Sequence, residues 1–145
     1  MPLSFTEVNW LAVLVAAVVA FGVGFLWYGP LFGKRWADGM GFGTLTPEQQ
    51  KAIQQGAMPA YAMSVVVNLV IAWGLAVVFN ALGVVGLGSA LGVAFVLWAV
   101  FTFAPTVNSL FFRGPNSPPN DLYWIDSSHR LALLLAEAAV LALMA

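Results

Sequence analysis

Residues 57–82 read AMPAYAMSVVVNLVIAWGLAVVFNAL and contain no charged side chain. A membrane core about 30 Å thick is crossed by roughly 20 consecutive apolar residues in an α-helix. Residues 8–28 and 84–110 reach the same length without a charge, and residues 122–144 reach it with several. The sequence therefore predicts an all-α integral membrane four-helix bundle, a single transmembrane domain over residues 1–145.

The composition agrees with a membrane protein. Of 145 residues, 61% are hydrophobic and 8% are charged, against roughly 25% charged residues in a soluble domain. This excludes a soluble enzyme, a nucleic-acid-binding protein and a disordered regulator, and it makes the lipid bilayer the expected surroundings. Because the chain has no cysteine, it cannot form disulfides, thiolate zinc sites or a cysteine nucleophile.

Basic residues indicate the orientation of the spans. All Lys and Arg residues outside the spans fall in the segments 29–56 and 111–121, namely Lys34, Arg35, Lys51 and Arg113. By the positive-inside rule these two loops are cytoplasmic and both termini lie on the outer side. Loop 29–56 is expected to lie along the membrane interface.

One short helix is predicted inside that loop. Thr46 precedes Pro47, and Gln49 follows Thr46 by three residues. This is the pattern of a capping box with proline at the first helical position, so a polar helix should run from about Pro47 to Gly56.

Small residues recur at four-residue spacing, which lets membrane helices approach closely. They predict helix packing at Ala12, Ala16, Ala20, Gly24, Gly88 and Gly92. The same positions could instead serve another copy of the chain or a different subunit.

The first and third spans end alike. Residues 20–36 (AFGVGFLWYGPLFGKRW) resemble residues 94–114 (AFVLWAVFTFAPTVNSLFFRG), each with a proline, large aromatics and then a cation. Two duplicated hairpins explain this, and so does the shared need for an apolar span with an aromatic belt. Pro105 is expected to kink the third span, with Thr102, Thr106 and Asn108 satisfying freed backbone groups.

Ionisable residues share one face of the fourth span. At about 100° per residue, Arg130 lies about 40° from Asp126, Glu137 about 20° from it, and His129 about 60° to the other side. Asp126 and Arg130 are spaced for an i, i+4 salt bridge. Glu137 is deeper, and Asn68 in the second span is its expected hydrogen-bonding partner.

This polar stripe has three interpretations. It is a satisfied polar core, a proton or cation path, or a metal site in an intramembrane enzyme. One histidine with spaced carboxylates is a poor zinc pattern, so we predict no metal, no cofactor and no catalytic residue.

Several motifs resemble a known family. They are Asn9-Trp10, Trp27-Tyr28-x-Pro30-x-Phe32 and Ile125-Asp126-x-x-His129-x-Leu131, together with Trp36, Pro105, Asn108 and residues 111–113. They are similar to bacterial four-span membrane proteins of domain of unknown function 1761. The resemblance covers nearly the whole chain and implies a location in the bacterial cytoplasmic (inner) membrane, but it brings no activity.

The sequence thus predicts a small multi-pass membrane protein. Its expected role is that of a non-catalytic accessory or assembly subunit, or of a self-associating bundle, within a homo-oligomer or a larger membrane complex. The alternative is a small oligomeric transporter or channel that uses the polar stripe, and an enzyme ranks third.

Overall fold

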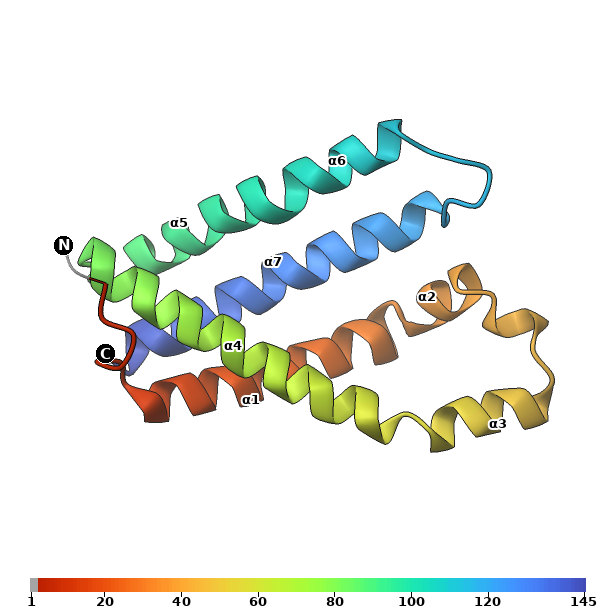
Figure 1. Cartoon of the computed structure of the whole chain (residues 1–145), viewed down its shortest axis with the longest axis horizontal. Coiled ribbons are helices and arrows are strands. Elements are labelled where there is room, and N and C mark those ends of the chain that lie inside the picture. The colour runs from red at the N-terminus through yellow and green to blue at the C-terminus, as the bar shows by residue number, and fades with distance from the viewer. Residues whose placement is uncertain (1–2) are drawn as a thin grey trace.

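The computed structural model describes residues 3–145, and those residues form helices, turns and loops without a strand. Four long helical segments run along the molecule (Figure 1). They are α1 with the π-helical turn η1, then α4, then α5 with the π-helical turn η3 and α6, and finally α7. The elements are α1 (Trp10–Leu26), η1 (Trp27–Leu31), α2 (Gly33–Gly39), η2 (Phe42–Thr44), α3 (Pro47–Gln55), α4 (Met58–Leu82), α5 (Leu87–Trp98), η3 (Ala99–Phe103), α6 (Ala104–Phe111) and α7 (Asn120–Leu143).

Three of these segments are long and apolar enough to cross a membrane. They are Trp10–Leu31, Met58–Leu82 and Leu87–Phe111, close to the first three predicted spans. α7 has 24 residues, but any 18 consecutive residues of it contain at least three of its four charged side chains. The chain is therefore a helical protein with three apolar helices able to span a bilayer.

Both termini lie at one end of the molecule, while α2, α3 and the link from α6 to α7 lie at the other (Figure 1). The Asn9 side chain caps α1 by accepting a hydrogen bond from the Ala12 N–H, and its amide donates to the Met144 carbonyl at 2.9 Å. The start of α1 is thus fastened to the end of α7. We call residues 10–20, 72–82, 87–94 and 134–143 the terminal half, and residues 24–31, 58–68, 99–111 and 120–130 the loop half.

The terminal half is packed through alanines. α7 lies between α1 and α5, and α4 packs against α1 and α7. Ala12, Ala16 and Ala20, which the sequence analysis selects as packing residues, are at most 1% exposed. Ala12 and Ala16 belong to one buried cluster with alanines of the other helices, namely Ala72, Ala90, Ala94 and Ala138.

Gly88 and Gly92 do not pack inside the molecule, contrary to the prediction. A methyl group added at either would meet nothing within 4 Å. α5 turns Ala90 and Ala94 inward instead, and residues two positions apart lie about 200° around a helix. The glycine pair therefore faces outward.

The predicted short polar helix is present as α3. The Gln49 N–H donates to Thr46 Oγ1 at 3.2 Å, and the Thr46 N–H donates to Gln49 Oε1 at 2.9 Å. Both halves of the capping box are present, and Pro47 opens the helix.

The prolines of the first and third spans are accompanied by widened helical turns. Pro30 lies inside η1, and Pro105 follows η3 by two residues. A proline removes a backbone donor, and the π-helical turn is one way in which a helix absorbs the resulting break. As expected, a nearby threonine hydroxyl takes part: Thr106 Oγ1 donates to the Thr102 carbonyl at 2.7 Å.

A tryptophan at each widened turn bonds to α7. Trp27 Nε1 donates to the Ile125 carbonyl at 3.2 Å, and Trp98 Nε1 donates to the Ser127 carbonyl at 2.8 Å. The similar ends of the first and third spans are thus both hydrogen-bonded to one turn of α7.

Candidate functional site

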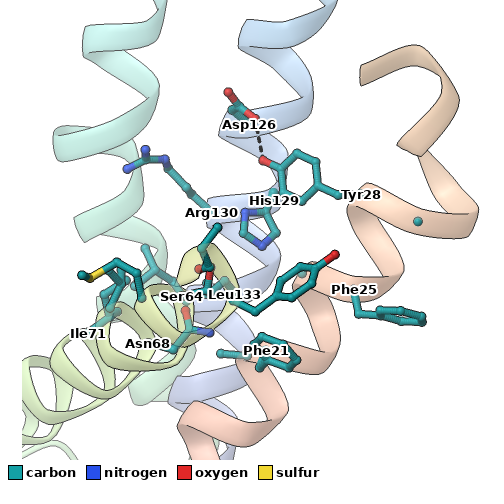
Figure 2. Close-up of a pocket in the computed structure, with 18 of the residues that line it drawn as sticks. Phe21, Phe25, Tyr28, Ser64, Asn68, Ile71, Asp126, His129, Arg130 and Leu133 are labelled. Carbon is teal, nitrogen blue, oxygen red and sulfur yellow. Dashed lines mark hydrogen bonds between the residues drawn. The ribbon is translucent and has the colours of Figure 1, made fainter. Parts of the chain in front are cut away.

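A cavity of about 820 Å³ lies in the loop half, between α1, α4 and α7, and we call it the lateral cavity. Figure 2 shows its labelled lining: Phe21, Phe25 and Tyr28 come from α1 and η1, and Ser64, Asn68 and Ile71 come from α4. α7 contributes Asp126, His129, Arg130 and Leu133.

The size of the side chains explains the cavity. Alanines hold α1 close to its neighbours in the terminal half, but Phe21 and Tyr61 stand edge to face between α1 and α4, with ring centroids 6.5 Å apart. α4 packs chiefly on α1, and α5 packs chiefly on α7, so part of the surface of the first turns of α4 is left uncovered. Met58 and Met63 are accordingly 73% and 61% exposed.

Asp126 is bonded to Tyr28, which corrects the predicted Asp126–Arg130 salt bridge. The Tyr28 hydroxyl donates to Asp126 Oδ1 (Figure 2). Within residues 3–145 the ion pair that forms is Arg35–Asp121 at the loop end, not Asp126–Arg130. The i, i+4 spacing on one helix was overridden because a neutral hydroxyl on the facing helix reaches the carboxylate.

His129 packs against the same tyrosine. The two rings meet edge to face with centroids 4.9 Å apart. Gly24 makes room for the imidazole, since a methyl group there would lie 3.4 Å from His129 Nε2. That nitrogen is buried and makes no hydrogen bond with any described residue.

Arg130 points away from the Asp126–Tyr28 pair, toward the helix formed by α5, η3 and α6 (Figure 2). There it also lines a second cavity of about 380 Å³ between that helix and α7, which we call the loop-end cavity. The two cavities share three residues, Thr102, Asp126 and Arg130. Arg130 therefore stands where the cavities meet.

Glu137 is separate from both cavities. Its side chain is fully buried, and neither carboxyl oxygen has a hydrogen-bonding partner among the described residues. The expected hydrogen bond with Asn68 is thus not made, because Asn68 faces the lateral cavity. Of the five predicted polar residues, the cavity brings together Asn68, Asp126, His129 and Arg130, and the core encloses Glu137.

Both cavities fall within a region that carries a family signature. The family described as "Protein of unknown function (DUF1761)" matches residues 11–142. The chain belongs to this family. No curated protein and no solved structure matches it. In this DUF1761 protein every residue that lines either cavity lies inside the matched region.

The lateral cavity of the DUF1761 chain is lined by both apolar and polar side chains. Among residues 3–145 no three His, Cys, Asp or Glu side chains lie close enough together to hold a metal ion. The lateral cavity offers aromatic and aliphatic walls with a few polar groups, which is the usual make-up of a small-molecule site.

Two residues of the DUF1761 site were not selected from the sequence. The sequence indicates Tyr28 only as part of the motif Trp27-Tyr28-x-Pro30 on which the family resemblance rests, and not as a partner of the polar stripe. No motif in the sequence indicates Ser127, because its position in the loop-end cavity depends on how α7 is rotated about its axis relative to η3. Its hydroxyl is buried and has no partner in the described part of the chain.

Proposed function

We propose that the protein is a non-catalytic, four-span membrane protein that acts by binding inside the bilayer, with the lateral cavity as its site for an amphipathic molecule. The single observation that carries this proposal is the cavity itself. It lies among the apolar helices, it is open, and its apolar walls lead to polar side chains that include Asp126, His129 and Arg130.

α7 is the fourth span in this proposal. Its 24 residues extend about 36 Å at about 1.5 Å each, which exceeds the membrane core of about 30 Å. It packs lengthwise between α1 and α5, which belong to apolar spans. Its charges are kept from lipid, because Glu137 is enclosed, Asp126 accepts from Tyr28, and Arg130 occupies the cavities. Ionisable residues in membrane helices face protein or water in this way.

Binding is tested with oleyl alcohol, measured by native mass spectrometry in a neutral maltoside detergent. Ser64 lines the lateral cavity and is small, so Ser64→Trp should fill the site and reduce the bound fraction about tenfold. Val66 is 52% exposed and does not line the cavity, so Val66→Trp is the matched control and should leave binding unchanged. Equal binding by both variants would remove the cavity from the proposal.

The proposed orientation places the loop end in the cytoplasm of a bacterial inner membrane. Lys34, Arg35, Lys51 and Arg113 all belong to segments at that end, which supports the positive-inside assignment. Because the chain has no cysteine, Gln54→Cys and Val85→Cys give clean reporters of the two ends. A membrane-impermeant maleimide added to intact cells should label Val85→Cys alone, and labelling of Gln54→Cys alone would reverse the topology.

An accessory role or self-association is supported by the outer face of α5. Only 11% of the most apolar stretch of Leu87–Phe111 is buried, and Gly88 and Gly92 face open space. Small residues allow a second helix to approach closely. Gly88→Leu with Gly92→Leu should then release a partner or dissociate an oligomer in mild-detergent extracts, as judged by sizing and mass identification. An unchanged size of the extracted particle would indicate that this face of α5 contacts lipid and not another protein.

Transport is the alternative, and the meeting of the two cavities at Arg130 favours it. A path would continue from there past the enclosed Glu137, and four spans leave little room, so more than one copy would be needed. Glu137→Gln in reconstituted vesicles should abolish a proton-coupled flux while the protein stays folded. Absence of flux in both proteins would leave binding as the function.

A further inference from the structure

Arg130 is the only Lys or Arg residue in the four long helical segments. It is the eleventh residue of α7, so its Cα lies about 15 Å along the helix, near the middle of the proposed span. A guanidinium at that depth is costly unless it has a partner or water. The side chain is exposed in the cavities and forms no ion pair within residues 3–145.

The nearest candidate partner on the same helix is already engaged. Asp126 lines both cavities with Arg130, but its carboxylate accepts a hydrogen bond from Tyr28 and makes no ion pair with Arg130, whose side chain is directed toward η3 and α6 (Figure 2). The guanidinium therefore presents its donors to the space between α7 and η3–α6. A planar guanidinium is suited to bind a carboxylate or a phosphate through two parallel hydrogen bonds.

A second donor faces the same space. Ser127 lines the loop-end cavity three residues before Arg130, which places the two side chains on one face of α7. Ser127 is 2% exposed, and its hydroxyl has no hydrogen-bonding partner among the described residues. A buried hydroxyl without a partner costs free energy, and an anionic oxygen in the loop-end cavity would satisfy it.

The two cavities differ in character on either side of Arg130. The lateral cavity has an apolar wall that includes Phe21, Phe25, Met63 and Ile71. The loop-end cavity has a larger polar share: apolar residues line part of it, and Asp126 and Arg130 reach it. The buried hydroxyl of Ser127 there makes no hydrogen bond within the described residues, whereas those of Thr106 and Ser109 donate to carbonyls of their own helical segment. An apolar tail fits the first, and a charged head group fits the second.

We propose that Arg130 and Ser127 bind the anionic head of an amphipathic lipid, a carboxylate or a phosphate, whose apolar tail occupies the lateral cavity. The inference rests on the proposed function, since it names the class of molecule that the cavity holds. Tyr28 acts as a positioning residue here, because its hydrogen bond holds the Asp126 carboxylate toward η1 and away from an ion pair with Arg130.

The test compares oleate with oleyl alcohol, which share a tail and differ in the charged head. Binding of each is measured by native mass spectrometry of the full chain in neutral maltoside detergent. We expect the wild-type chain to prefer oleate and Arg130→Gln to weaken oleate binding by about tenfold to a hundredfold, the range of a charged hydrogen bond. Oleyl alcohol binding should change less than about threefold. Lys51→Gln removes an equal charge on exposed α3 and is the matched control.

Two milder variants keep the test decisive if Arg130→Gln does not fold. Arg130→Lys keeps the positive charge but loses the planar guanidinium and its two parallel hydrogen bonds, so it should retain part of the preference for oleate. Ser127→Ala should weaken oleate binding several-fold and leave oleyl alcohol binding unchanged. Oleate binding that is unaffected by both variants would overturn the proposal.

The remaining outcomes separate the proposals and the source of the anion. Equal binding of oleate and oleyl alcohol would overturn the proposal that Arg130 and Ser127 bind an anionic head group, but would leave the proposal that the lateral cavity is a binding site. Binding of neither probe overturns the proposed function. Inorganic phosphate that displaces oleate from the wild-type chain but does not bind Arg130→Gln would identify a free anion as the ligand and overturn the lipid. Oleoyl lysophosphatidate that outcompetes oleate would assign the head group as a phosphate.

Discussion

The terminal half and the loop half are built from the same four helical segments, yet one is closed and the other is open. Ala16, Ala72, Ala90 and Ala138 are fully buried where the helices meet in the terminal half. The loop half replaces such residues with aromatic and ionisable side chains around a cavity of about 820 Å³. Because lipid and apolar side chains are similar surroundings, helix separation in a membrane follows side-chain size rather than hydrophobic drive.

The polar groups divide between the halves in the same way, with one exception. Asp126, His129 and Arg130 lie where the helices are apart, and Asp126 has a partner on another helix. Glu137 lies among the closely packed alanines and has none in the described residues. The comparison therefore predicts that substitutions change stability chiefly in the terminal half and change binding chiefly in the loop half.

The largest effect is expected from overpacking the terminal half. Ala16 is 0% exposed, so Ala16→Leu has no room for three more carbons and should lower the free energy of unfolding by about 1–3 kcal/mol or more. Thermal unfolding in detergent measures it. Val18→Leu, at a site that is 72% exposed on the same helix, should leave stability nearly unchanged. Equal behaviour of the two variants would mean that the alanine contacts do not hold the half closed.

Substitution of Glu137 should have the opposite effect to overpacking, because removing its buried carboxyl should stabilise the folded protein. Glu137→Met replaces an enclosed carboxyl that has no hydrogen bond by an apolar side chain of similar length, and should raise the free energy of unfolding by about 1–3 kcal/mol. Glu48→Met on exposed α3 should change it by less than about 0.5 kcal/mol. A loss of stability in Glu137→Met would show that the carboxyl has a bound partner, such as a cation, in the membrane.

In the loop half, the hydrogen bond between Tyr28 and Asp126 should contribute a smaller amount to the free energy of unfolding. Tyr28→Phe and Asp126→Asn should each lower the free energy of unfolding by about 1 kcal/mol, because each weakens one hydrogen bond. A double-mutant cycle measured by thermal unfolding should give a loss in the double variant clearly below the sum of the two. Strict additivity would indicate that the two side chains do not interact.

The smallest effect is expected at the loop end. Arg35 Nε and Asp121 Oδ2 are 4.0 Å apart, and both side chains are more than 60% exposed. Exposed ion pairs contribute little, so Arg35→Gln should change stability by less than about 0.5 kcal/mol at moderate salt. A larger change that disappears at high salt would show that this pair fastens α2 to α7.

Local signals in the sequence were enough to place the three apolar helical segments and α3. Uninterrupted apolar runs gave the three spanning segments, and the spacing of Thr46, Pro47 and Gln49 gave α3. Such signals act within a few residues or within one helix. They need no knowledge of the neighbouring segments, and this is why they could be interpreted from the chain alone.

The rotation of each helix about its axis could not be predicted. A soluble helix shows its buried face by its apolar stripe, but α5 is apolar on all sides and lipid accepts each of them. Gly88 and Gly92 were therefore as good a packing face as Ala90 and Ala94, which the structure selects. The same uncertainty hid the pairing of Asp126 with Tyr28, since the contact depends on how α1 and α7 are turned toward each other.

The hydrogen bond from Asn9 to the Met144 carbonyl holds the start of α1 beside the end of α7, so the first and last of the four helical segments begin and end at the same place. A circular permutant is then feasible, in which a short linker joins the two ends and a new opening is cut in the proline-rich link at 112–119. Its helices would follow one another in the order α7, α1, α4 and then α5 with α6. A permutant that folds would show that the arrangement of the helices follows from their contacts rather than from their order along the chain.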